Sequence, residues 1–192
     1  MQAIAERIIT VFGSSRPIEG EADYEQAREL GRALAGRGFA VCTGAHSGVM
    51  EAVSRGAKEA GGKTYGVTTE FFTNLKANEW IDVEVRVKTL QDRLFELIKL
   101  GDGFVACKGG TGTLAELAVV WEMLNKSVMT GKPFVSLGDF WQPILERVRE
   151  VETAPADSWS EAQGALVAPL ATPKGAAEYL AEKLSAMKRE RQ

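Results

Sequence analysis

Strand-like and helix-like patterns alternate along the first third of the chain, and very short connections join them. Apolar runs cover 8–12, Phe39–Thr43 and Lys63–Thr68, and apolar residues at helical spacing lie between them, over Asp23–Arg37 and Val49–Ala60. Two strands joined through a helix by connections this short must run parallel. The pattern therefore predicts an α/β fold with a doubly wound, mostly parallel sheet and helices on both faces.

The remaining chain continues this alternation without a clear domain boundary. Asp82–Lys88 alternates valine with polar residues, as in a strand with one wetter face, and Thr89 begins a helix with Asp92 as its capping partner. The later elements are expected as a strand over Gly103–Cys107, a helix over Thr113–Asn125, a strand at 133–137 followed by a helix, a strand over Leu166–Pro169 and a helix from Pro173 to about Lys188. We therefore expect residues 1–192 to form a single domain.

Three segments bear on how the chain is organised beyond these strands and helices. The N-terminal residues MQAIAERIITVFG mix charges with a short apolar run and lack a small-residue cleavage pattern, so no signal peptide is expected. Thr69–Trp80 has no period and is expected to be a loop that covers the ligand site. Thr153–Gln163 is the only long polar interruption.

The charge balance and the cysteine content limit the class of protein. The 23 lysines and arginines against 26 aspartates and glutamates give a net charge of −3, which disfavours binding to nucleic acid through its phosphates. No uncharged stretch reaches the roughly 18 apolar residues of a membrane span. Cys42 and Cys107 each end an apolar run, at a spacing that fits no zinc site, and are expected as buried thiols. We expect a cytoplasmic protein with no nucleic-acid or membrane partner, no metal and no cofactor.

Three loops of small residues follow three of the expected strands. Ligands of open parallel sheets bind beyond the carboxyl ends of the strands, where the strand order reverses. Glycine, serine and threonine at several strand ends suit a phosphorylated ligand, because they donate hydrogen bonds without filling the space of the phosphate. Ordinary turn and cap chemistry is the alternative explanation. The candidate phosphate- or nucleotide-binding residues are Gly13, Ser14, Ser15, Gly44, His46, Ser47, Gly48, Lys108, Gly109, Gly110, Thr111, Gly112 and Thr113.

Two charged side chains are candidates for catalysis. Arg93 falls on the apolar side of its helix, at about 100 degrees per residue, and therefore points inward. An inward guanidinium needs a partner, for which Glu116 or a ligand phosphate would serve, and a structural buried ion pair is the alternative. Glu116 lies one turn behind the glycine loop and would face the ribose of a nucleotide, although with Thr113 it also has the spacing of a capping box.

Other chemistries find little support in the sequence. His46 is the only histidine, and its place in a glycine turn suits a ligand contact or a cap better than a nucleophilic triad. No GxxxxGK[ST] loop occurs. Gly110, Gly112 and Ala115 match the dinucleotide fingerprint GxGxxA, which leaves an NAD-type redox protein as a third reading, but the match follows about the fifth strand rather than the first.

The octet GGTGTLAE, Gly109–Glu116, resembles the GGxGTxxE core of the LOG family, the cytokinin riboside 5′-monophosphate phosphoribohydrolases, and of the related molybdenum-cofactor carrier proteins. VFGSSRP, TGAHSGVMEAVSRGA and the position of Arg93 extend the resemblance to about Val148. It implies a Rossmann-like nucleotide-binding domain and a homodimer or higher homo-oligomer. It also implies hydrolysis of the N-glycosidic bond of a nucleoside monophosphate to free base and ribose 5-phosphate, with Arg93 and Glu116 as the catalytic residues.

Four positions differ from the family pattern. Lys108 replaces the usual proline before the glycines, Gly44 is followed by Ala45 and His46 instead of two further glycines, and Leu94 replaces a lysine. These differences favour an alternative in which the protein is a carrier that binds a nucleotide or a phosphorylated cofactor such as the molybdenum cofactor without turnover. Some relatives carry the label lysine decarboxylase, but no residue here marks a pyridoxal-phosphate lysine.

Overall fold

The structure is a computed structural model that describes residues 6–72, 76–152 and 166–190. In this part of the chain seven strands form one sheet in the order β4-β3-β2-β1-β5-β6-β7, and every neighbouring pair is parallel. The strands are β1 (Ile8–Phe12), β2 (Ala40–Thr43), β3 (Thr64–Thr69), β4 (Val83–Val87), β5 (Gly103–Ala106), β6 (Phe134–Leu137) and β7 (Val167–Leu170).

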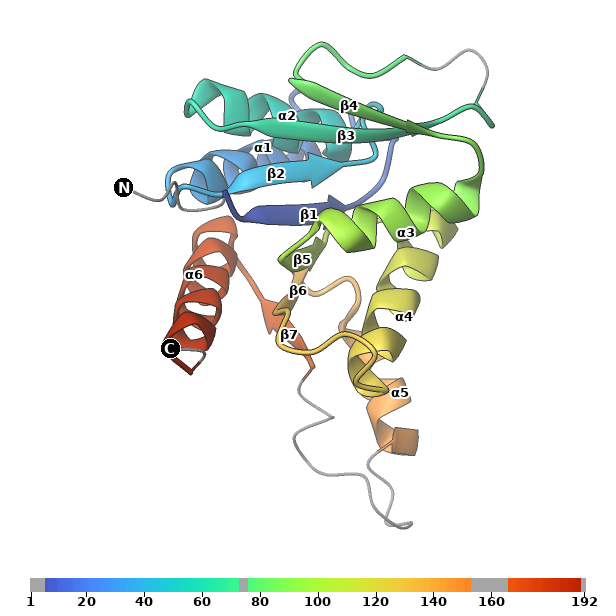
Figure 1. Ribbon diagram of the computed structural model, residues 1–192, viewed down its shortest axis with the longest axis vertical. Helices are drawn as coiled ribbons and strands as arrows, with labels where there is room; N and C mark the ends of the chain where they lie inside the picture. Colours follow the sequence, from blue (N-terminus) through green and yellow to red (C-terminus); the bar gives the residue numbers. More distant parts are fainter. Residues whose placement is uncertain (1–5, 73–75, 153–165, 191–192) are drawn as a thin grey trace.

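Helices cover both faces of the sheet (Figure 1). They are α1 (Ala22–Ala35), α2 (Val49–Glu59), α3 (Leu90–Leu100), α4 (Thr111–Asn125), α5 (Gln142–Glu152) and α6 (Pro173–Glu190). Side chains alternate across a strand, so Val105 packs in the core under α1, α2 and α6, whereas Phe104 packs with Phe12 under α3, α4 and α5. These two cores hold the sheet between two layers of helices.

The strand order reverses at β1. This strand pairs with β2 on one side and with β5 on the other, with Ile9 opposite both Val41 and Gly103. The chain runs outward through β2, β3 and β4 and then returns to place β5 beside β1. The connections after β1 and β5 therefore leave the sheet toward opposite faces, which opens a crevice between them at the carboxyl edge.

Two glycines let α1 and α2 approach closely. A Cβ at Gly31 would collide with the carbonyl oxygen of Val53, and a Cβ at Gly56 would collide with that of Arg28. The small-residue stripe of α2 thus packs against the neighbouring helix as well as the sheet. This contact holds α2 against α1, and α2 directly follows the loop after β2.

The structure confirms the doubly wound fold, and every strand of the described residues is parallel. The expected capping pair of Thr89 and Asp92 forms a complete capping box, and the valines of β4 alternate with more exposed residues. Cys42 and Cys107 are buried free thiols, and burial raises the pKa of each to about 12. Among the described helices, none has the length and apolar character to cross a membrane. The expectations for residues 1–5, for the polar interruption at Thr153–Gln163 and for 73–75 within Thr69–Trp80 lie outside the described residues.

Candidate functional site

A cavity of about 1330 Å³ lies at the carboxyl edge of the sheet, around the point where the strand order reverses. The loops after β1, β2 and β5 line it together with Arg93 and Glu116. Of the residues proposed from sequence, the lining contains Gly13, Ser14, Ser15, Gly44, His46, Ser47, Lys108, Gly109, Gly110, Thr111, Gly112, Thr113, Arg93 and Glu116. Gly48 stands behind the wall, where a Cβ would collide with the main chain of Ser14 and Ser15.

The N-terminus of α4 opens into this cavity without a side-chain cap. Gly110 is the N-cap residue, and the first turn carries no acidic residue. The helix begins at Thr111, two residues earlier than predicted, and no side chain caps it. The alternative explanation of Thr113 and Glu116 as a capping box is therefore wrong. The first amides of a helix have no partner within it, and here they lie on the cavity wall.

The glycines of this turn differ in what surrounds them. A Cβ at Gly109 would collide with the side chain of Thr113, so this position must be glycine for the turn to close. At Gly110 and Gly112 a Cβ would meet no atom within 4 Å. The space beside these two glycines is therefore left open, as an anion approaching the amides at the helix N-terminus would require.

Arg93 reaches into the cavity from α3, as its helical phase predicts. Its Nε donates to the carbonyl oxygen of Val67 at 2.9 Å and its Nη2 donates to that of Gly44 at 2.8 Å. These two bonds hold the guanidinium on main-chain carbonyls after β2 and within β3, and among the described residues no ion pair joins it to Glu116, one of the two partners considered from the sequence. A Cβ at Gly44 would collide with the guanidinium, so glycine there is needed for this approach.

Glu116 projects from the second turn of α4 toward the same place. It is partly exposed through the cavity, but protein atoms surround its carboxyl group, and this burial raises its pKa to about 7 against the opposing effect of Arg93. Burial also lowers the pKa of Arg93, while Glu116 raises it. Each of the two charges therefore shifts the pKa of the other group, although no hydrogen bond joins them. Glu116 can change its charge near neutral pH.

The described residues between β3 and β4 contact the loop after β2. Asn78 holds it: the Asn78 main-chain N donates to the carbonyl oxygen of Ala45 at 2.8 Å, and its Nδ2 donates to that of His46 at 2.9 Å. The ring of His46 lies edge-on to that of Phe72, with centroids 5.6 Å apart. The expectation that Thr69–Trp80 lies over the site thus agrees with its described part, from which Phe72, Lys76 and Asn78 line the cavity.

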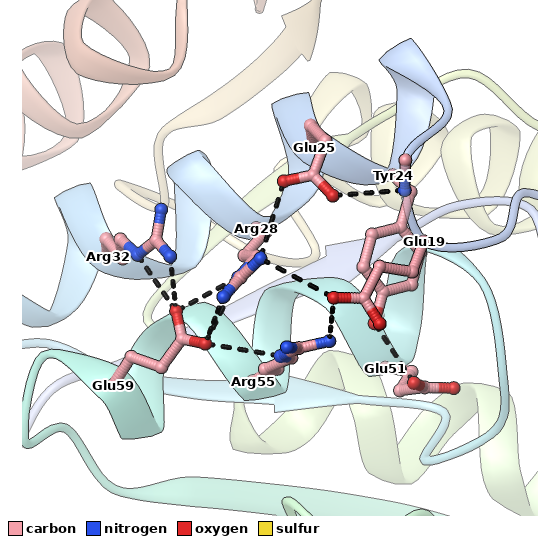
Figure 2. A network of polar contacts seen from close by, with 9 residues as sticks. Glu19, Tyr24, Glu25, Arg28, Arg32, Glu51, Arg55 and Glu59 are labelled. Atoms are coloured by element: carbon pink, nitrogen blue, oxygen red, sulfur yellow. Dashed lines mark hydrogen bonds and ion pairs between the residues drawn. The ribbon is translucent and has the colours of Figure 1, made fainter.

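An ion-pair network fixes the loop after β1 (Figure 2). Arg55 of α2 contacts Glu19 of this loop at 2.7 Å and Glu59 at 3.2 Å, and its guanidinium carbon stands 5.5 Å from the centre of the Trp80 ring. Arg28 of α1 reaches Glu19 from the other side, at 3.9 Å. Arg55 thereby joins two segments that both border the cavity, the loop after β1 and the segment before β4.

Charges of both signs line the cavity. Lys108 Nζ lies 2.8 Å from the carboxylate of Asp23, so the lysine of the glycine turn is paired with the first turn of α1. The pairing raises the pKa of Lys108. Sequence reasoning missed Asp23 and Asn78, because their contacts join distant segments and leave no local pattern. The remaining charged lining residues are Arg16, Glu21, Glu51 and Lys76.

The fold is that of a Rossmann-like α/β protein, with a large cavity at its strand-order reversal. Residues 6–161 match the SLOG cluster4 family, LDcluster4, and the chain belongs to this family. The resemblance to the LOG family is thereby confirmed.

Comparison with individual proteins agrees with this assignment. The chain is 31% identical over 147 residues to the cytokinin riboside 5′-monophosphate phosphoribohydrolase of Rhodococcoides fascians, covering 73% of each chain. It is 33% identical over 115 residues to the protein of that name from Mycobacterium tuberculosis, covering 59% of this chain and 61% of the other. Among solved structures, the molybdenum cofactor binding protein of Rippkaea orientalis superposes with a TM-score of 0.75 at 24% identity, over 95% of this chain and 99% of the other. The molybdenum cofactor carrier protein of Chlamydomonas reinhardtii has a TM-score of 0.69 at 25% identity, over 94% and 99%.

Proposed function

We propose that the protein is a nucleoside 5′-monophosphate phosphoribohydrolase, which uses water to cleave the N-glycosidic bond and releases the free base and ribose 5-phosphate. The observation that carries this proposal is Glu116, a carboxyl group with a pKa of about 7 on the wall of a cavity into which an uncapped helix N-terminus opens. The names of the relatives that share 31–33% identity support the same reaction class.

The phosphate end of the ligand would bind at α4. The amides of Thr111, Gly112 and Thr113 are the first three of the helix, and the positive end of its dipole favours an anion there. The open space beside Gly110 and Gly112 would admit the phosphate oxygens. Glu116, on the next turn, would then face the sugar.

In the reaction, Glu116 acts as the general acid–base group. Its ionised form takes a proton from a water molecule while the water oxygen bonds to C1′ of the ribose. The bond between C1′ and the base nitrogen breaks, its electron pair stays with the base, and that nitrogen takes up a proton. A carboxyl with a pKa of about 7 suits this exchange because it both accepts and returns protons near neutral pH. Arg93 stabilises the ionised carboxylate through space.

A panel of nucleotides tests the reaction. Purified protein would be incubated with AMP, GMP, CMP and an adenine-ribotide analogue, and free base would be measured by chromatography. Glu116→Gln keeps the shape of the side chain and removes the titrating group, so it is the matched control. We expect base release from at least one nucleotide by the natural chain. No release above this control for any of the four would contradict the proposal.

A carrier function is the second candidate, and the size of the cavity favours it. About 1330 Å³ exceeds the range of about 300–1,000 Å³ that is usual for small-molecule pockets. The structural neighbours named as molybdenum cofactor binding and carrier proteins support a larger phosphorylated ligand. Native mass spectrometry of the protein as purified separates the two functions: a retained cofactor-sized ligand without turnover supports the carrier, and an empty protein that releases base counts against it.

We also propose that the protein is a homodimer. Exposed apolar side chains on α3 and α4 support this proposal, since Leu90 is 40%, Phe95 54% and Leu114 36% exposed. Sedimentation equilibrium would show it, and a monomer at all concentrations would contradict it. A single domain over 1–192 and a cytoplasmic location stay predictions.

A further inference from the structure

The side chain of His46 has two buried nitrogens without a partner. Among the described residues nothing accepts from or donates to Nδ1 or Nε2, and both atoms are shielded from solvent. Leaving a buried polar atom unpaired costs about 1–3 kcal/mol. Yet the residue lines the ligand cavity, and its ring is covered by the edge of Phe72. Such an arrangement is costly in the unliganded protein and becomes favourable when a ligand supplies the partners.

The backbone around His46 is held in one conformation. Asn78 ties the carbonyl oxygens of both Ala45 and His46 to the segment before β4. Ala45 has a φ of 63°, which is uncommon for a residue other than glycine and persists where surrounding contacts impose it. The imidazole is therefore placed on the cavity wall by the fold, and a turn of the ring or a shift of Phe72 would present a nitrogen to the cavity.

The charge of His46 decides which part of a ligand it can bind. Burial lowers the pKa of the imidazole, and the positive charge of Arg93 lowers it further. His46 is thus neutral at pH 7, with one nitrogen as donor and one as acceptor. A neutral imidazole is a poor partner for a phosphate dianion but suits a heterocycle, which offers ring nitrogens together with amino or oxo groups.

The sheet order separates His46 from the phosphate site. His46 follows β2 and the glycine turn follows β5, and β1 lies between these two strands. Neighbouring strands lie about 4.8 Å apart, so the two strand ends are roughly 10 Å apart. A hydrogen bond spans only about 3 Å. With this separation, a ligand whose phosphate is held by α4 can place another of its groups beside His46.

We propose that His46 is the residue that recognises the nucleobase, or an equivalent nitrogen heterocycle, of the ligand whose phosphate binds at α4. The inference rests on the proposed function for the position of the phosphate. It adds that specificity for the base comes from a neutral imidazole at the end of β2, with Phe72 as its apolar neighbour.

The single histidine of the sequence makes a direct test possible. In tag-free protein, the ring signals of His46 are followed by NMR while ligand is added, using Glu116→Gln so that nucleotides are not consumed. The probes are AMP, GMP, CMP and ribose 5-phosphate, which has the phosphate and sugar but no base. We expect at least one nucleotide to shift the ring nitrogen signals strongly and ribose 5-phosphate to leave them nearly unchanged.

Calorimetry with variants of His46 completes the test. His46→Phe keeps an aromatic ring and removes the polar atoms, so nucleotide affinity should fall about tenfold, while that for ribose 5-phosphate stays within about twofold. His46→Gln restores a donor and an acceptor and should recover part of the loss. Equal losses for both ligands in His46→Phe, or no loss for either, would overturn the role of His46 and leave the proposed function standing. If neither ligand binds even with His46 present, the proposed function fails as well.

Discussion

Replacing Glu116 by glutamine should stabilise the unliganded protein, and only at high pH. Burial raises the pKa of this carboxyl from 4.5 to about 7 in the folded chain. At pH values between about 4.5 and about 7 the folded chain holds more protons than the unfolded chain. The free energy of unfolding therefore falls as the pH rises through this range. At about 1.4 kcal/mol per pKa unit, ionisation of Glu116 costs the fold about 3 kcal/mol in total.

Urea denaturation at pH 5 and pH 8 measures this cost. Most of this pH range lies between pH 5 and pH 8, so the difference in unfolding free energy between Glu116→Gln and the natural chain should increase by about 2–3 kcal/mol from pH 5 to pH 8. Titrating groups elsewhere are shared by both chains and cancel. Glu122→Gln is the matched control: it makes the same substitution further along α4, where the side chain is 58% exposed, and should change the difference by less than about 0.5 kcal/mol. The reasoning is refuted if the advantage of Glu116→Gln is the same at both pH values.

Four further outcomes follow from the residues in and around the cavity. Gly112→Ala should weaken phosphate binding by about tenfold or more in calorimetry, because its Cβ enters the open space, and should leave the melting temperature unchanged or higher, because alanine favours a helix over glycine. Gly109→Ala should instead lower the free energy of unfolding by about 1–3 kcal/mol through its collision with Thr113. Arg55→Met should raise KM about threefold to tenfold with little change in kcat, because Arg55 joins two cavity segments without lining the cavity, and an unchanged KM would count against this role. NMR titration should give His46 a pKa below 6.5, so that its protonation reduces stability as the pH falls under that value, and a pKa of 6.5 or higher would contradict its burial.

Local patterns carry the information that predicts this fold. Short apolar runs and helical stripes specify strands and helices, and short connections leave parallel pairing as the arrangement compatible with them. The three loops could be placed together from sequence because the carboxyl ends of parallel strands share one edge. The inward direction of Arg93 could also be predicted, because it depends only on the helical repeat of its own segment.

Contacts between distant segments could not be predicted in this way. The partners of Arg93 are main-chain carbonyls of Gly44 and Val67, which any residue type provides and no sequence pattern marks. The spacing of Thr113 and Glu116 suggested a capping box, but the glycine turn closes earlier and begins the helix at Thr111. Asn78 was overlooked because its role depends on the fold bringing it onto the loop after β2.

Hydrolysis in heavy-oxygen water tests the central claim most directly. The natural chain and Glu116→Gln would each be mixed in excess with AMP, GMP or CMP in H₂¹⁸O, and the products analysed by mass spectrometry after a single turnover. We predict that the natural chain releases equal amounts of free base and ribose 5-phosphate from at least one nucleotide, with one ¹⁸O in the sugar phosphate, and that Glu116→Gln releases neither at a comparable rate. Intact nucleotide recovered from the natural chain in every case, or product formed equally by both chains, would contradict Glu116 as the catalytic group of this cavity.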